Sequence, residues 1–184
     1  LDRMRRPYTR ETYLELIGKM REYIPGVSLS TDIITGFCGE TEQQHQDTLN
    51  LMKEVKYDLA YMFAYSERER TLAHRKFPDD VPEDVKKRRL AEIIDVQQNT
   101  AAELNKKEIG NRHVILVEKT SKRSEGQMSG RTDTNKMAVF DKMDLQPGDY
   151  AEVEVIDATA ATLIARPVRK TTLSESIKTE SISL

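Results

Sequence analysis

The sequence has 184 residues, 38% of them hydrophobic and 33% charged, which is enough for one large or two small domains with a well-solvated surface. A net charge of −2 and a pI of about 6.0 give no global signal for nucleic-acid binding, so any basic patch has to be local. No apolar run approaches the roughly 20 residues of a membrane span. The single cysteine, Cys38, excludes an internal disulfide and a cysteine-rich metal site made by this chain alone.

The start of the chain does not resemble a signal peptide, because no apolar stretch follows the basic first residues. The first residue is Leu1 rather than Met. We therefore expect a fragment of a soluble, cytoplasmic protein.

Residues 9–24 predict a helix, since their apolar residues recur at helical spacing and Thr9 can cap the first turn. A strand is expected over residues 27–37. Thr41 and Gln44 then have the spacing of a capping box, in which each side chain bonds the backbone amide of the other. This box predicts the start of a second helix.

The next strand is expected over residues 57–65, which are almost continuously apolar, as in a parallel sheet with helices on both faces. The order helix–strand–helix–strand predicts βα units. Because two parallel strands cannot bury themselves, we expect further strands of this sheet before Leu1. For the fragment alone we expect an exposed sheet edge and poor solubility.

Residues 67–79 are predicted as a polar loop dense in Arg and Glu. A long helix follows, with Asp80 as its cap, Glu83 completing a capping box and Gly110 ending it. Its inward face is expected to carry Leu90, Ile93, Ile94, Ala101 and Leu104.

After Gly110 the pattern changes to short strands, expected over residues 114–117, 137–140, 151–156 and 159–165. Several short strands in about 60 residues favour a small barrel or sandwich. The fold class is therefore α/β followed by a small all-β domain. We place the boundaries of the two domains and of a disordered, Ser- and Thr-rich tail at residues 1–108, 109–169 and 170–184.

Two strand ends form a candidate ligand site. Residues 36–41 end one predicted strand and open a helix, and Tyr65 and Ser66 end the next strand at the same edge, where α/β sheets bind ligands. Gly36 and Gly39 would let the backbone approach a ligand, and a helix N-terminus favours anionic groups. An ordinary βα turn fits the same residues.

Two groups of basic residues are candidates for anion binding. Arginines crowd the N-terminus, where they meet a carboxylate or phosphate or are simply solvated: Arg3, Arg5, Arg6 and Arg10. A second group lies in the barrel-like region: Lys119, Lys122, Arg123, Arg131 and Lys136. On a small barrel such a cluster suits an RNA backbone, and a solvated loop suits it equally. Aromatic residues for base stacking are scarce there.

Other reactive side chains give no pattern of a site. His45, His74 and His113 lie in different predicted elements, without metal-ligand spacing, and are interpreted as structural or solvent-exposed. Cys38 is interpreted as a small residue in a turn. The sequence has neither a nucleophile elbow nor a phosphate loop, so we assign no catalytic and no metal-binding residue.

Taken together, six segments resemble the MiaB-type methylthiotransferases. They are MRRPYT (4–9), STDIITGFCGET (30–41), AYS (64–66), DVPEDVKKRRL (80–90), SKRS (121–124) and SGRTDTNK (129–136). The resemblance covers residues 1–168. It implies the C-terminal part of a radical SAM partial (β/α) barrel followed by a TRAM domain, a small β-barrel that helps to bind RNA.

The resemblance also implies an activity and its cofactors. Such enzymes use S-adenosylmethionine and two 4Fe-4S clusters to place a methylthio group on C2 of N6-isopentenyladenosine beside the tRNA anticodon. The six cluster cysteines of the family are absent from this chain, and Cys38 is not a counterpart of any of them. We therefore expect a monomeric fragment that is inactive alone and binds the tRNA anticodon stem-loop.

By the same resemblance, two sets of residues are candidates for binding. Those expected to border the S-adenosylmethionine pocket are Asp32, Gly36, Phe37, Gly39, Glu40, Tyr65 and Ser66. Those matching the RNA-facing motif of the barrel are Lys122, Arg123, Arg131, Asn135 and Lys136. Relatives often read Pro-Gly-Thr where this chain has Glu69, Arg70 and Thr71, so we expect an altered turn there.

Two alternatives remain open on the sequence. The sibling enzymes that methylthiolate an aspartate of a ribosomal protein are compatible with the early Arg5-Arg6-Pro7, although residues 80–90 and 129–136 look more like the tRNA enzymes. The other alternative is a non-catalytic RNA-binding protein with a degenerate α/β half.

Overall fold

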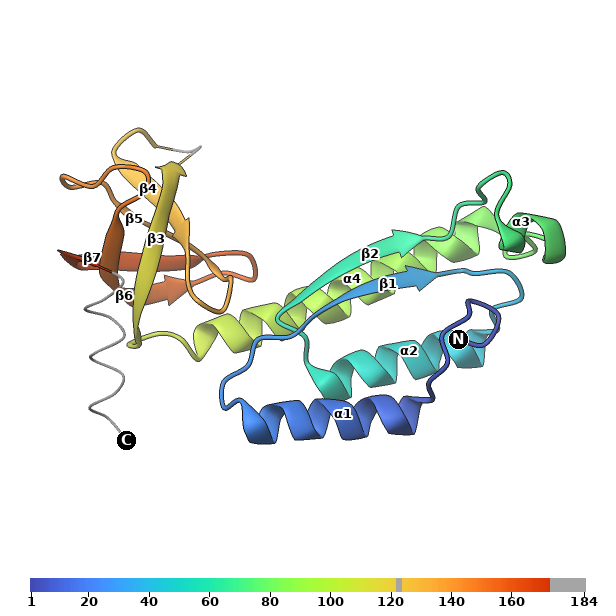
Figure 1. Ribbon diagram of the computed structural model, residues 1–184. Helices are drawn as coiled ribbons and strands as arrows, with labels where there is room; N and C mark the ends of the chain where they lie inside the picture. The colour runs from blue at the N-terminus through green and yellow to red at the C-terminus, as the bar shows by residue number, and fades with distance from the viewer. Residues whose placement is uncertain (122–123, 173–184) are drawn as a thin grey trace. The chain divides into compact units, whose positions relative to one another are not determined.

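Alternating helices and strands build the first of two compact units, Leu1–Thr100, in the computed structural model, which describes residues 1–121 and 124–172 (Figure 1). The second unit is Ala101–Leu184. The elements that begin in the first unit are α1 (Arg10–Tyr23), β1 (Ser30–Thr35), α2 (Glu42–Val55), β2 (Leu59–Ala64), α3 (Leu72–Lys76) and α4 (Glu83–Lys106).

Both predicted N-caps of the first two helices are confirmed. The Thr9 hydroxyl accepts a hydrogen bond from the Thr12 amide over 3.3 Å at the start of α1. At α2 the Thr41 hydroxyl accepts from the Gln44 amide over 3.2 Å, and the Gln44 side chain accepts from the Thr41 amide over 3.0 Å. These bonds satisfy amides that have no partner within the helix, so both helices begin where the sequence predicts.

The strands β1 and β2 pair in parallel, as predicted, but helices cover only one face of the pair. Ile33 and Met62 point from the two strands into the core that α1, α2 and α4 share. That core consists of Ile17, Leu29, Leu49, Met52, Val55, Tyr57 and Ile93. The opposite face is exposed, so the prediction of helices on both faces is wrong for these residues.

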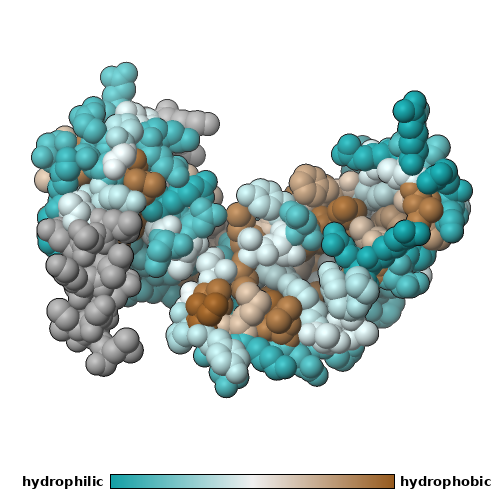
Figure 2. All heavy atoms as spheres, in the orientation of Figure 1, coloured by the Kyte–Doolittle hydropathy of each residue, from teal (hydrophilic) through white to brown (hydrophobic). Residues whose placement is uncertain are grey.

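The exposed face of the strand pair is rich in apolar side chains. Ile34 is 42% exposed on β1, and Tyr61 and Phe63 are 56% and 54% exposed on β2. Hydrophobic residues reach the surface along these strands in Figure 2. The continuous apolar pattern of β2 therefore reflects one face packed on helices and another that has nothing packed on it among the described residues.

Residues 67–79 are not entirely a loop, because the short helix α3 lies within them. The Thr71 hydroxyl accepts from the His74 amide over 3.2 Å and caps this helix. Arg70, just before the cap, has a φ of 66°, the left-handed conformation that glycine adopts most readily. The turn therefore keeps a glycine-type backbone although Arg occupies the position.

The long helix α4 begins at Glu83, and the prediction of Asp80 as its cap is wrong. The Asp80 carboxylate accepts a hydrogen bond from the Gly39 amide over 2.6 Å instead. Ile93 is fully buried on the predicted inward face, but Lys86 and Arg89 are buried beside it at 1% and 4% exposure. The predicted inward face contained apolar residues alone, so these two cations were not expected on the buried face of α4.

The second unit is a closed barrel, which confirms the predicted small all-β fold. Its strands are β3 (Arg112–Thr120), β4 (Gln127–Arg131), β5 (Met137–Asp141), β6 (Tyr150–Ala158) and β7 (Leu163–Thr171), hydrogen-bonded in the order β3-β4-β5-β7-β6. The strand β4 was missed because its sequence, QMSGR, is polar. The strand β7 extends to Thr171, so the tail expected from Lys170 is strand at its first residues, and residues 173–184 lie outside the described residues.

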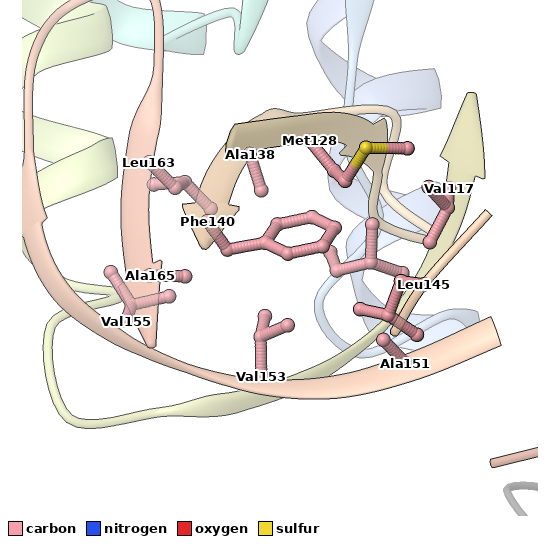
Figure 3. Close-up of a cluster of buried hydrophobic side chains, with 11 residues drawn as sticks. Val117, Met128, Ala138, Phe140, Leu145, Ala151, Val153, Val155, Leu163 and Ala165 are labelled. Atoms are coloured by element: carbon pink, nitrogen blue, oxygen red, sulfur yellow. The ribbon is translucent and has the colours of Figure 1, made fainter. Parts of the chain in front are cut away.

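The barrel core surrounds Phe140, which is 1% exposed (Figure 3). Met128, Val153 and Leu163 approach its ring from three other strands. The inward positions of β6 alternate with partly exposed Glu152 and Glu154, as the period-two pattern predicts. In the part of the chain that the structure describes, no helix has the length and apolar character needed to cross a membrane.

At Gly130 on β4 the neighbouring strand β3 leaves no room for a side chain. A Cβ there would collide with the Leu116 carbonyl oxygen and lie 2.6 Å from Ile115 Cγ2. Gly126 is a matched control, because the nearest atom to its Cβ, Ser124 Oγ, would be 3.7 Å away.

We predict that Gly130→Ala lowers the free energy of unfolding by about 2 kcal/mol or more, since the strand pair has to separate to admit a methyl group. Gly126→Ala should change it by less than about 1 kcal/mol. Urea unfolding followed by circular dichroism measures both. Equal stability of the two variants would show that the close approach at Gly130 is not needed for the barrel.

Candidate functional site

The strand-end loop, residues 36–40, follows β1 at the carboxyl end of the strand pair. Phe37 and Cys38 are buried within it at 8% and 1% exposure. The Tyr65 amide donates to the Thr35 carbonyl over 2.8 Å, and the rings of Phe37 and Tyr65 meet edge to face at 5.0 Å. The structure therefore brings the two predicted strand ends together.

Glu40 closes the strand-end loop on itself. Its carboxylate accepts hydrogen bonds from the Thr35 hydroxyl over 3.2 Å, the Gly36 amide over 3.0 Å and Arg89 Nη1 over 2.9 Å. Arg89 Nη1 also donates to the Glu40 carbonyl over 3.0 Å. The carboxylate thus accepts three hydrogen bonds from groups of the protein itself, and in this structure these bonds hold the loop in place.

The two glycines of the loop make room for side chains of the protein itself. A Cβ on Gly36 would lie 2.5 Å from Lys86 Cγ, and a Cβ on Gly39 would collide with the guanidinium of Arg3. Both residues have a positive φ, 74° and 69°. We expected these glycines to admit a ligand, and the space that their missing side chains leave is filled by Lys86 and Arg3.

Lys86 is a buried lysine whose charge is neutralised locally. Its ammonium donates to Asp79 over 2.7 Å and to Glu83 over 2.9 Å, and it lies 5.6 Å from the centre of the Tyr65 ring. Burial lowers the pKa of Lys86, but these hydrogen bonds outweigh that effect and raise it above its ordinary value. Burial also raises the pKa of Tyr65 to about 12, so both groups stay protonated at neutral pH.

Asp32 lies apart from the strand-end loop, on the exposed face of the strand pair. In the parallel register Asp32 is opposite Tyr61, and Ile34 is opposite Phe63. A carboxylate flanked by exposed aromatic and aliphatic side chains suits a ligand that has both a flat apolar part and a positive charge. Ser66 is also exposed, beyond the end of β2.

A second group of ionisable side chains lies between α2 and α4. Glu42, His45 and Glu92 place three ligand-type atoms within 4.8 Å of one another. Arg88 bridges the two carboxylates at 2.7 Å each, and Arg89 reaches Glu42 at 3.2 Å. The hydrogen bond from Arg88 is the main reason that the pKa of Glu42 falls to about 2. Arginines thus already neutralise the charge that would attract a cation.

In the barrel, the turn between β4 and β5 is held by its own side chains. Arg131 Nη1 donates to both the carbonyl and the side-chain oxygen of Asn135, each over 3.0 Å. Asn135 has a φ of 63°, and the Thr132 amide donates to the Lys136 carbonyl over 3.0 Å. Arg131 also pairs with Glu118 at 3.4 Å and remains 41% exposed. The turn is therefore rigid and presents a cation to solvent.

Lys136 faces inward more than the sequence indicates. Its side chain is 11% exposed and its ammonium donates to Glu108 over 2.8 Å. The same carboxylate meets His113 at 3.0 Å and Asn111 at 3.2 Å. Burial raises the pKa of Glu108, but the bonds from Lys136 and Asn111 prevail and hold it below its ordinary value. Contact of Lys136 with RNA stays a prediction. Lys122 and Arg123 lie outside the described residues.

Comparisons with known proteins connect both units to one group of enzymes. Residues 106–168 match the TRAM domain. Over 168 residues the chain is 49% identical to the tRNA-2-methylthio-N(6)-dimethylallyladenosine synthase of Christiangramia forsetii, an alignment that covers 91% of this chain and 35% of the relative. The chain is homologous to tRNA methylthiotransferases.

Two eukaryotic proteins match at slightly lower identity. The mitochondrial tRNA methylthiotransferase CDK5RAP1 of Mus musculus is 44% identical over 189 residues, which cover 96% of this chain and 32% of the relative. The CDK5RAP1-like protein of Oryza sativa subsp. japonica is 45% identical, over 98% of this chain and 32% of its own length. The chain spans about a third of the length of the curated relatives it matches.

Sequence reasoning missed the residues that hold the strand-end loop in place. Lys86 and Arg89 lie on α4, three residues apart, and Arg3 lies in the N-terminal segment. The available signal was spacing, because Lys86, Arg89 and Ile93 follow the same helical period and so share one face. We assumed instead that the inward face would be apolar. The roles of Gly36, Phe37, Gly39, Glu40, Tyr65, Asp32 and Ser66 in ligand binding stay predictions.

We predict that Gly36→Ala destabilises the first unit by about 2 to 4 kcal/mol, because it adds a collision with Lys86 to the strain of a positive φ. Gly26→Ala is the matched control, since Gly26 has the same φ of 74° and no atom within 4 Å of its Cβ. Gly26→Ala should be destabilised by the backbone strain alone, about 1 kcal/mol. Thermal unfolding of the two variants compares these costs, and equal losses would refute the contact with Lys86.

Proposed function

We propose that this chain is the C-terminal part of a tRNA methylthiotransferase that places a methylthio group on C2 of N6-isopentenyladenosine beside the anticodon. The observation that carries the proposal is the identity of 44–52% to named tRNA methylthiotransferases over about 90% of the chain, through both units. The names of the bacterial relatives specify the 2-methylthio product and the dimethylallyl (isopentenyl) adenosine.

The first unit is proposed as the end of a radical SAM partial (β/α) barrel. The apolar exposed face of β1 and β2 supports this, because such a face calls for further strands and their side chains to cover it. In the proposed barrel this face would look inward. Ligands of such sheets bind at the carboxyl ends of the strands, where the strand-end loop lies.

S-adenosylmethionine fits the side chains on this face. The Asp32 carboxylate can accept hydrogen bonds from its ammonium or ribose groups, and Tyr61 and Phe63 offer apolar surface to its adenine. When bound, the group would supply a radical for activating the adenosine C–H bond, once an iron–sulfur cluster held by residues outside this chain had given it one electron. The residues of this chain would bind and orient it and help to exclude water.

The iron–sulfur clusters do not fit this chain. A 4Fe-4S cluster of this kind needs at least three cysteine ligands, and the sequence has Cys38 alone. The Cys38 thiol is buried and points to the Phe77 carbonyl, 3.9 Å away. Cluster ligands have to come from outside these 184 residues, and no step involving a cluster is assigned to this chain.

The TRAM barrel is proposed to contact the anticodon stem-loop of the tRNA. The turn between β4 and β5 supports this proposal, since it holds Arg131 and Asn135 in a fixed arrangement with the guanidinium partly exposed. A preorganised arginine suits phosphate or sugar contacts. The names of the relatives favour tRNA over a ribosomal-protein substrate. A monomeric state and a cytoplasmic location stay predictions, and the mouse relative is named as mitochondrial.

The test is fluorescence anisotropy of a labelled anticodon stem-loop with the whole chain across a salt series. We predict salt-dependent binding, and we predict that Lys122→Ala/Arg123→Ala reduces the slope of log K against log salt by about 1 to 2. The control, Lys19→Ala/Lys53→Ala, removes two exposed cations from α1 and α2 and should leave the slope unchanged. A folded chain that binds no stem-loop at low salt would contradict the proposed RNA contact.

A further inference from the structure

A cluster of exposed cations lies at the carboxyl edge of the strand pair, outside the barrel. The edge cations are Arg5, Arg6, Arg68, Arg70, Arg75 and Lys76. Among the residues that the structure describes, the side chains of these six make no ion pair and no hydrogen bond. Elsewhere in the first unit, Arg10 pairs with Glu54, and Lys86 and Arg89 are buried in ion pairs. Other exposed cations of the first unit, such as Lys19 and Lys53, lie singly on α1 and α2, whereas these six fall in two short segments of the chain.

Four of the edge cations lie in a segment whose backbone is held by hydrogen bonds and by a ring contact. Between β2 and α4, the Thr71 amide donates to the Arg68 carbonyl over 3.3 Å, and Thr71 caps α3. The Phe77 ring then packs on Phe37 at 6.2 Å. Arg68, Arg70, Arg75 and Lys76 are therefore carried by a segment that is anchored to the strand-end loop at Phe77.

The N-terminal segment brings two more cations to the same loop. Arg3 Nη1 donates to the Cys38 carbonyl over 2.5 Å, which ties this segment to the strand-end loop. The Arg5 amide donates to the Asp2 carbonyl over 2.9 Å and closes a turn directly after Arg3. Arg5 and Arg6 therefore follow within a few residues of the anchored Arg3, close to the strand-end loop.

The acidic residues nearby are largely engaged elsewhere. Asp79 and Glu83 pair with Lys86, and Asp80 accepts from the Gly39 amide. Glu67 lies 3.9 Å from His74. Glu69 is the remaining exposed acid between β2 and α3. Residues 67–76 carry four cations against Glu67 and Glu69, and residues 1–6 carry three arginines against Asp2. Each segment therefore has an excess of positive charge, and its self-repulsion is relieved when a polyanion binds.

The chemistry of the edge cations suits phosphodiester groups. Five of the six are arginines, whose planar guanidinium groups bind phosphate oxygens in pairs. They come from two separate segments, the N-terminal turn and the segment around α3, which suits an extended chain of phosphates better than one isolated anion. The surface around α3 is mostly hydrophilic in Figure 2, so it offers little for an apolar partner.

We propose that the edge cations bind the phosphate backbone of the RNA substrate, as a contact surface of the first unit that is separate from the TRAM barrel. This inference rests on the proposed function and extends it by naming where the first unit meets the RNA. Contacts to phosphates position an RNA without reading its sequence. The edge cations would therefore hold the RNA at the edge of the sheet where the ligand site is proposed.

The experiment compares two double variants of the whole chain in stem-loop binding across a salt series. Arg68→Ala/Arg75→Ala removes two edge cations and leaves Arg70, with its positive φ, in place. Lys19→Ala/Lys53→Ala removes the same charge from α1 and α2, towards the opposite edge of the sheet. The expected result is a slope of log K against log salt that falls by about 1 to 2 for the first variant only. Circular dichroism checks that both are folded.

Three other results would overturn the inference, each in a recognisable way. If both variants keep the slope of the unmodified chain, the RNA contact of the edge cations is refuted and the proposed function stands. If the unmodified, folded chain shows no salt-dependent binding, the proposed function fails and the inference falls with it. If polyglutamate competes as well per charge as RNA does, the surface belongs to an acidic protein partner instead.

Discussion

Two buried cations on α4 connect this helix to the loop at the end of β1, and the structure of the first unit depends on that connection. Lys86 and Arg89, three residues apart on α4, place their charges against Asp79, Glu83 and Glu40, and Glu40 in turn holds the Gly36 amide. Losing one partner of such a pair would leave an uncompensated buried charge, at a cost of about 3 to 5 kcal/mol. This connection between helix and loop holds the strand-end loop in place, and the segment around α3 packs on that loop through Phe77.

Because of this connection, Gly36, Gly39 and Glu40 have a structural role, whereas their sequence pattern favours a role in ligand binding. A glycine-rich strand end followed by a helix is typical of a ligand site, and the resemblance to methylthiotransferases points the same way. In the structure the space beside both glycines holds Lys86 and Arg3, and the Glu40 carboxylate bonds to the protein. The loop is thus held by contacts within the protein, and we propose that a ligand meets the open sheet face apart from it, where Asp32, Tyr61 and Phe63 are exposed.

Local chemistry explains which elements the sequence could predict. The caps at Thr9 and Thr41 and the alternation of β6 each depend on neighbours within a few residues, so their patterns are visible in the sequence. The failures depend on distant partners. Asp80 was expected to cap α4 and instead binds the Gly39 amide, 41 residues away. The polar strand β4 exists because β3 and β5 pair with it, which no periodicity within QMSGR reveals. The buried position of Arg89 likewise requires Glu40, 49 residues away, and that of Lys136 requires Glu108, 28 residues away.

Amide hydrogen exchange at Gly36 tests the central claim most directly, because this amide bonds to Glu40, which Arg89 holds in place. In the unmodified chain the Gly36 amide should exchange slowly. In Arg89→Met, which keeps an unbranched apolar stem but is shorter and carries no charge, we predict that the protection of the Gly36 amide falls about tenfold or more. The Lys56 amide at the end of α2, bonded to the Met52 carbonyl, should keep its protection. Equal protection of Gly36 in the two proteins would show that the loop holds its shape without the buried arginine, and would contradict the central role of α4.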